Sequence, residues 1–269
     1  MLKFTIIDHP ESVTNAFTFA DWIHQLADKL PPEGTGALWL RGHGDSAWKL
    51  KPLVGRPITT GGLYDDAKMA ADENVFFDSE SEILQRFKRD SYPFVQRSLT
   101  DWEAITFGQH HGLPTRLLDW SSNPLVALFF AAEKHDDKDG AVFAYRRRRD
   151  ASFHVSMFYG QNPKKPDVPK PLKIRGIKIV FPMLIADRLI TQSGGFTIQD
   201  PLKDIRDQAA EEFSKEDLDI LELHRWFIPA AAKQRIREEL HRVNINHRAL
   251  FPGLDGVGQG IQIAERIRK

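Results

Sequence analysis

The chain of 269 residues contains no cysteine, which excludes disulfides, thiolate nucleophiles and thiolate metal ligands. No apolar run approaches the roughly 20 residues of a membrane-spanning helix, and the opening stretch MLKFTIIDHPESV has no signal-peptide cleavage pattern. Neither sign of charge is in excess, because 37 Lys and Arg balance 37 Asp and Glu. We therefore expect a cytoplasmic protein without membrane contact, in which any attraction to nucleic acid comes from a local cluster.

Hydrophobic periodicity and stop signals predict a mixture of helices and strands. Helices are expected at 13–30, 79–90, 100–112, 123–135, 183–195, 201–213, 230–244 and 254–267. Strands are expected at 37–42, 140–145, 173–181 and 226–229, with loops at 55–78 and a basic, proline-rich surface excursion at 146–171. The mixture predicts a single α+β domain spanning residues 1–269, with small mixed or antiparallel sheets surrounded by helices.

One stretch, GQHHGLPTRLLDWSSNPLVALFFAAEKH (108–135), crowds polar groups before an apolar helix. Asn123 is a good N-cap and Pro124 suits the first helical position, so residues 119–122 would form the helix entrance. The unpaired N–H groups and the dipole of such an entrance attract a phosphate or carboxylate. Arg116 could add a fork of donors, and Trp120 could stack on a planar ring.

A purely structural interpretation of the same residues stays open. Asp119 could pair with Arg116, Ser121 or Ser122 could cap the helix, and Trp120 could belong to the core. The strand at 37–42 poses the same question, since it ends at Arg41 and Gly42 in the sequence RGHGD. Arg41 could bind an anion, with glycines allowing close backbone approach, or form an ion pair with Asp45.

Two further patterns carry weaker hypotheses. His110 and His111 are adjacent, so on a helix they point in different directions, and no further ligands follow at metal-site spacing. No metal is therefore expected, although either histidine could serve a hydrolase as a base. The run RRRR at 146–149 could contact a nucleic-acid backbone or form a solvated loop.

Several motifs resemble those of the FRG domain, a bacterial and phage family named for Phe-Arg-Gly. LWLRGHGDSAWKLKPLVGR (38–56) resembles its opening motif, with Leu40 in place of the Phe, and GQHHGLPTRLLDWSSNPLVALFFA (108–131) resembles its central signature. RLITQSGGF (188–196) and FIPAAAKQRIREELHRVNINHRALFPGLDG (227–256) are similar to its later segments. The resemblance covers about residues 20–256, and the family often occurs beside toxin or phage-defence functions.

A remoter resemblance is to ADP-ribosyltransferases of the Arg-Ser-Glu type. In these enzymes an arginine is followed by a strand with serines and then by a helix with an A-x-x-F-A pattern. The chain has a similar order, in which Arg41 comes first and Ser121 or Ser122 follows. The helix after them carries Ala127, Phe130 and Ala131. This resemblance implies an ADP-ribosyltransferase-like fold that binds nicotinamide dinucleotide (NAD) as substrate. The chain departs from the pattern where a late glutamate is expected, because TQSGGF offers Gln192 there.

The resemblance implies roles for the polar cluster. Arg41 and the helix entrance would hold phosphate, Ser121 and Asp119 the ribose, and Trp120 or Phe196 the nicotinamide. The expected catalytic residues are Arg41, Asp119, Ser121 and Gln192. The expected NAD-binding residues are Arg41, Gly42, His111, Thr115, Arg116, Trp120, Ser122 and Phe196.

These assignments lead to a function and a geometric expectation. The chain would transfer ADP-ribose from NAD to a protein or nucleic-acid acceptor, or hydrolyse NAD. The alternative is a non-catalytic module that binds a nucleotide or nucleic acid. In the folded chain, one cleft is expected to gather Arg41, Arg116, Asp119, Trp120, Ser121 and Gln192.

Overall fold

The computed structural model describes residues 1–30, 34–57, 73–149, 170–181 and 194–267. Its strands form one mixed sheet of seven, in the order β1-β7-β4-β2-β3-β6-β5. β1 runs parallel to β7, and the other neighbours are antiparallel. In sequence order the strands are β1 (Thr5–Asp8), β2 (Gly34–His43), β3 (Leu117–Ser121), β4 (Gly140–Arg148), β5 (Lys178–Val180), β6 (Gly194–Ile198) and β7 (Ile220–Ile228).

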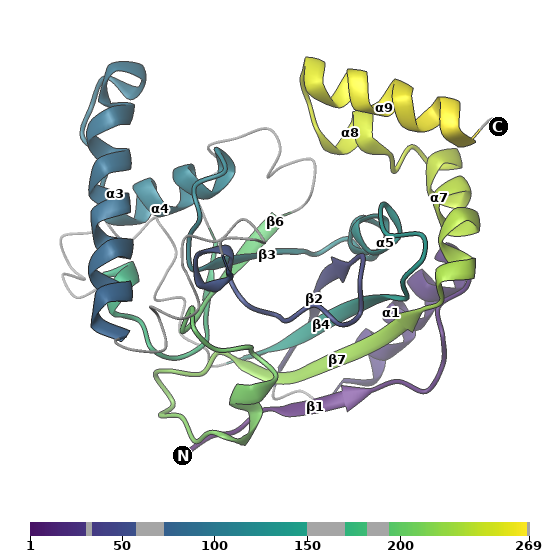
Figure 1. The fold of residues 1–269 in the computed structure, drawn as a ribbon. Coiled ribbons are helices and arrows are strands. Elements are labelled where there is room, and N and C mark those ends of the chain that lie inside the picture. Colours follow the sequence, from purple (N-terminus) through teal and green to yellow (C-terminus); the bar gives the residue numbers. More distant parts are fainter. Residues whose placement is uncertain (31–33, 58–72, 150–169, 182–193, 268–269) are drawn as a thin grey trace.

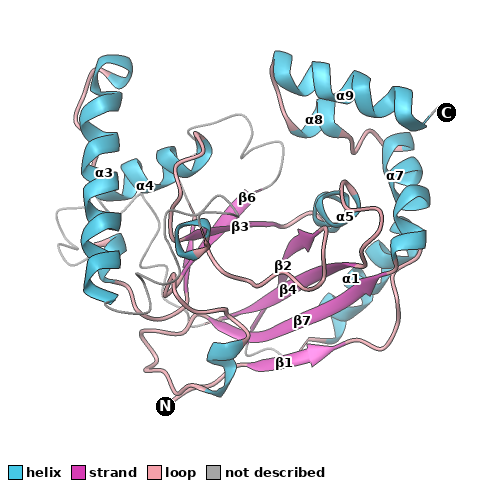
Figure 2. Cartoon of the chain, in the orientation of Figure 1, coloured by secondary structure: helices cyan, strands magenta, loops and turns pink. Residues whose placement is uncertain are grey.

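The helices gather at the two ends of the sheet and on one face (Figures 1 and 2). They are α1 (Ala16–Lys29), α3 (Glu73–Val95), α4 (Asp101–His110), α5 (Pro124–Ala132), α7 (Lys233–Arg242), α8 (His247–Leu250) and α9 (Leu254–Ile267). In Figure 1, α3 and α4 lie on the left and α7, α8 and α9 lie on the right, beyond α5. The predicted α+β class is confirmed. No helix in the described part of the chain has the length and apolarity to cross a bilayer.

Side chains of β2 and β4 alternate between two cores, as strand geometry requires. Leu40 and Ala144 face α1, α5 and α7, where they pack with Phe19, Ala127 and Ile236. On the opposite face, Phe143 and Tyr145 pack under the loops that carry Leu50, Ile205 and Phe213. A third cluster joins α3 and α4 to β3, β5 and β6, through Leu84, Ile105, Leu117, Val180 and Phe196.

Most predicted elements are present with shifted bounds. The capping box of Thr100 and Glu103 begins α4, and Asn123 caps α5 as expected. α3 and β7 are longer than predicted, β1 was not predicted, and 201–213 holds only a 3-10 turn at Asp207–Ala210. The predicted helix at 183–195 lies largely outside the described residues.

Gly194 and Gly195 are the first residues of β6. A Cβ built on Gly195 would lie 2.8 Å from Cζ3 of Trp39, so the glycine admits an indole that reaches across β3 from β2. The small residue is thus needed for packing across the sheet, and the predicted helix that these glycines were expected to end stays a prediction.

The arginine run is also not a surface loop. Arg146, Arg147 and Arg148 belong to β4, and each is at most 8 % exposed. Arg146 donates to both carboxylate oxygens of Glu222 on β7, at 2.8 and 2.7 Å. The register of β4 between β2 and β7 buries these side chains, which removes the basis for a nucleic-acid contact at 146–148.

Candidate functional site

A pocket of about 320 Å³ opens where β2 and β3 separate. The register of these two strands joins only Leu40 to Ser121, so β2 continues to His43 while β3 leads away. The pocket is lined by Leu40, Arg41, Gly42, Gly44, Trp48, Asp119, Trp120, Ser121, Val126, Ala127, Phe130, Glu133, Lys134, His135, Gly194, Gly195 and Phe196. A volume of this size lies at the lower end of the range of about 300–1,000 Å³ that is typical of small-molecule sites.

Arg41 spans the gap between the separating strands. Its Nη1 donates to the backbone carbonyl of Asp119 at 2.8 Å and lies 3.7 Å from the Asp119 carboxylate. Its Nε donates to Nε2 of His43 at 3.2 Å. Burial lowers the pKa of Arg41, an effect that the charge of Asp119 opposes. The guanidinium is thus fixed at the pocket wall, with its side chain 18 % exposed.

Asp119 is the open carboxylate of the pocket, with 58 % of its side chain exposed. A chain of hydrogen bonds orients it from behind. The Thr115 hydroxyl donates to Oε1 of Gln109 at 2.6 Å, and Nε2 of Gln109 donates to Oδ2 of Asp119 at 3.0 Å. Oδ1 of Asp119 has no hydrogen bond to the described residues, so it can accept one from a ligand.

α5 comes very close to β2 beside the pocket. A Cβ on Gly42 would lie 1.9 Å from the Ala127 carbonyl oxygen and 2.6 Å from the Ala131 nitrogen. The glycine therefore lets the helix backbone approach the strand. At the helix start, the Ser121 hydroxyl accepts from the Asn123 N–H at 3.0 Å, and Oδ1 of Asn123 accepts from Leu125 at 2.9 Å.

Trp48 and His135 form an aromatic wall. Their rings meet edge to face with centroids 5.0 Å apart, and 43 % of Trp48 is exposed. The fully buried Lys233 of α7 holds the backbone behind this wall. Its Nζ donates to the carbonyls of Gly44, Lys134 and His135 at 2.6, 3.0 and 2.8 Å.

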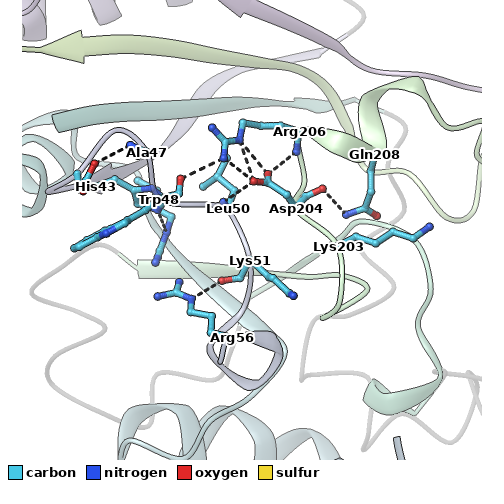
Figure 3. A network of polar contacts seen from close by, with 12 residues as sticks. His43, Ala47, Trp48, Leu50, Lys51, Arg56, Lys203, Asp204, Arg206 and Gln208 are labelled. Carbon is cyan, nitrogen blue, oxygen red and sulfur yellow. Dashed lines mark hydrogen bonds and ion pairs between the residues drawn. The ribbon is translucent and has the colours of Figure 1, made fainter. Parts of the chain in front are cut away.

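The pocket borders a strongly cationic region. Burial and then the charges of Arg41, Arg56 and Arg206 lower the pKa of His43 well below 6.5, so the imidazole is neutral. Burial and then the charge of Arg41 lower the pKa of Arg56 to about 10. Arg206 differs from these because it is paired with Asp204, with Nη2 and Oδ2 2.6 Å apart (Figure 3).

Comparison with protein-family models finds a match to the FRG domain at residues 36–140. This part of the chain is therefore similar to an FRG domain, as its motifs predicted. No curated protein and no solved structure matches the chain. The FRG match includes β2, β3 and α5, which supply most of the pocket, while Gly194, Gly195 and Phe196 lie beyond it. The predicted likeness of the fold to ADP-ribosyltransferases stays a prediction.

Several predicted site residues meet at the pocket, namely Arg41, Gly42, Asp119, Trp120, Ser121 and Phe196. Asp119, Trp120 and Ser121 lie in β3 itself rather than in a helix-entrance loop. Trp120 is only 3 % exposed, and its Nε1 donates to the Thr197 hydroxyl at 2.9 Å. Its ring belongs to the core beside Tyr145, so it is not available to stack on a ligand. Phe196 is likewise buried, at 1 % exposure.

Arg116 does not reach the pocket. It is fully buried and forms a two-pronged ion pair with Glu80 of α3, in which Nε lies 2.8 Å from Oε1. Its Nη1 also donates to the Ile174 carbonyl at 3.2 Å. The prediction that Arg116 binds phosphate is therefore wrong, because the N–H donors of its guanidinium group point into the protein interior.

Three more expectations change. Thr115 is buried and acts on the pocket only through Gln109. His111 is exposed and lines a different hollow, between α3 and α4. Ser122 is exposed in the turn before α5 and does not line the pocket. Gln192 lies outside the described residues. Among the residues that the structure describes, no cluster of three His, Asp or Glu could hold a metal ion.

Sequence reasoning missed Trp48, Gln109, His135, Lys233 and Arg56. Trp48 and Arg56 stand in the stretch that resembles the opening FRG motif, so that motif could have pointed to them. Gln109 opens the central signature. The position of Lys233 follows from tertiary contacts alone and carries no local signal. The alternative ion pair of Arg41 with Asp45 does not form, since Asp45 accepts from the Ala47 N–H at 2.9 Å.

Proposed function

We propose that this protein is an ADP-ribosyltransferase-like enzyme that takes NAD into the pocket between β2 and β3. It would cleave the bond to nicotinamide and pass the ADP-ribose to a protein or nucleic-acid acceptor, or to water. A role in the cytoplasm as a toxin or phage-defence effector fits such an activity, because modification of a macromolecule or loss of NAD harms a cell.

The observation that carries this proposal is the pairing of Arg41 with Asp119 in one open pocket. Nη1 of Arg41 lies 3.7 Å from the Asp119 carboxylate, although the two residues are 78 positions apart in the chain. The reaction needs a cation for the phosphates of NAD and an anion near the ribose. Both groups are present, and each is held in place by a second contact.

The chemistry assigns a task to each group. As the bond to nicotinamide breaks, positive charge develops on the ribose, and a carboxylate beside it stabilises the transition state. Asp119 supplies that carboxylate, with Oδ1 available for a ribose hydroxyl. Glu133 also lines the pocket, but its carboxylate pairs with His247 at 3.4 Å. The exposed indole of Trp48 offers a face for the nicotinamide or adenine ring.

Release of nicotinamide from NAD, with and without cell lysate as a source of acceptor, tests the activity. Asp119→Asn keeps the shape of the side chain and removes its charge, so we expect nicotinamide release to fall by about 100-fold or more. Asp21→Asn, on the far helix α1, is the matched control and should retain wild-type rates. Wild-type protein that releases no nicotinamide under either condition would refute the enzyme proposal.

A non-catalytic nucleotide-binding module is the second candidate. It is favoured by the departure at Gln192, where the related enzymes carry a glutamate. Saturable NAD binding that is lost in Arg41→Gln, together with no nicotinamide release by the wild-type protein, would establish this alternative.

A further inference from the structure

Arg56 does not line the pocket itself, but its charge and that of the pocket residue Arg41 act on each other. It follows the 3-10 turn Leu53–Gly55, which is docked on the segment leading into β3 by the bond from the Val54 N–H to the Thr115 carbonyl, 3.3 Å. Among the described residues, no carboxylate forms an ion pair with Arg56. In the part of the chain that the structure describes, a second arginine thus lies within the electrostatic influence of Arg41 and has no ion-pair partner.

The orientation of Arg56 is fixed from its inner side. Its Nε donates to the Lys51 carbonyl at 2.9 Å, while neither of its terminal nitrogens has a hydrogen bond to the described residues (Figure 3). Nη2 of Arg41 is equally without a partner there, because that guanidinium uses Nε and Nη1. Each arginine is therefore anchored and still has donors for a ligand.

The charges around these donors favour an anion. The pKa of Arg56 is lowered to about 10 by burial and by the charge of Arg41, and Asp119 opposes this shift only in part. Arg56 is nevertheless charged at neutral pH. His43, which accepts a hydrogen bond from Arg41, is neutral and cannot balance these charges. Two cations share one carboxylate, Asp119, which is more than half exposed.

A bound phosphate would balance this excess of positive charge and would receive the unpaired N–H groups. Guanidinium groups donate to phosphate oxygens in pairs, which makes arginine a favoured residue for this ligand. A monocarboxylate would accept hydrogen bonds from only one guanidinium group, whereas a diphosphate has enough oxygens for both arginines.

We propose that Arg41 and Arg56 together form a phosphate-binding subsite that takes the diphosphate group of a nucleotide. This inference deepens the proposed function and rests on it only for the remainder of the ligand. The subsite places the diphosphate beside the end of β2, and the ribose that follows it then reaches Asp119.

Calorimetric titration with inorganic pyrophosphate at low salt tests the subsite without any reaction. We expect Arg56→Gln to weaken pyrophosphate binding at least tenfold. Arg56→Lys keeps the positive charge but loses the paired N–H donors of the guanidinium group. It should therefore weaken pyrophosphate binding less, by about threefold. Arg86→Gln, which removes one exposed arginine from α3, is the matched control and should bind as the wild type does.

The outcomes separate the two proposals. Pyrophosphate binding that depends on Arg56, with no release of nicotinamide from NAD, supports the subsite and refutes the enzyme. Nicotinamide release with an unchanged KM for NAD in Arg56→Gln and Arg56→Lys overturns the subsite and leaves the enzyme standing. Equal pyrophosphate affinity in Arg56→Gln and Arg86→Gln also overturns it. If Arg56→Gln does not fold, the comparison of Arg56→Lys with the wild type decides.

Discussion

Gly42 sets the distance between α5 and the sheet at the edge of the pocket. We expect Gly42→Ala to lower the free energy of unfolding by about 1–3 kcal/mol or more, because the new methyl group would overlap backbone atoms. The added Cβ would lie 1.9 Å from the Ala127 carbonyl oxygen, and a helix backbone cannot move aside as a flexible side chain can. Urea denaturation at pH 7 measures this change.

Gly258 supplies the control for that substitution. It lies in α9, and a methyl group added to it would meet no described atom within 4 Å. Gly258→Ala should therefore leave stability unchanged or raise it by up to about 1 kcal/mol, since alanine favours a helix more than glycine does. Equal stability of Gly42→Ala and the wild type would show that α5 can withdraw from β2, and the account of this packing would then be wrong.

For single residues, the sequence predicts the chemical role of a side chain better than the direction in which that side chain points. It identified Arg41 and Asp119 as pocket residues, and the structure brings them together. It also assigned ligand roles to Arg116 and Trp120, whose side chains are directed into the interior. On a strand, neighbouring residues face opposite sides, so Trp120 had to leave the face of Asp119 once residues 117–121 became β3.

At the scale of elements, α3 is tied to the start of β3 by one buried ion pair. Glu80→Gln should lower the free energy of unfolding by about 3–5 kcal/mol, because it leaves the fully buried Arg116 without a balancing charge. Urea denaturation measures the loss. Glu82→Gln, on the same helix, is the control and should change stability by less than about 0.5 kcal/mol. A loss in Glu80→Gln no larger than in Glu82→Gln would contradict this description.

Helices were easier to predict than strands because their signals are local. Asn123 and Thr100 mark helix starts through bonds within three residues, and both caps form as expected. β1 pairs instead with β7, more than 200 positions away, so nothing near Thr5 reveals its partner. The pocket itself depends on such distant pairing, since it exists only where β2 and β3 separate.

At the scale of the whole molecule, the fold holds histidines neutral among arginines. His43 lies within the influence of Arg41, Arg56 and Arg206, and burial is the largest cause of its lowered pKa. His224 on β7 is also buried, and its pKa is lowered although Glu222 opposes the shift. Burial, with a smaller contribution from nearby arginines, therefore makes the folded state resist protonation at these histidines.

Stability should for this reason decline in mild acid. Near and below pH 6.5 the unfolded chain binds more protons at these histidines than the folded chain does, so the free energy of unfolding falls as the pH falls. Each histidine held neutral contributes a slope of up to about 1.4 kcal/mol per pH unit. Urea denaturation of His43→Gln between pH 7 and 5 should show a shallower slope than the wild type. His24→Gln, at an exposed position of α1, should keep the wild-type slope, and identical slopes for the two variants would mean that His43 takes up its proton in the folded protein.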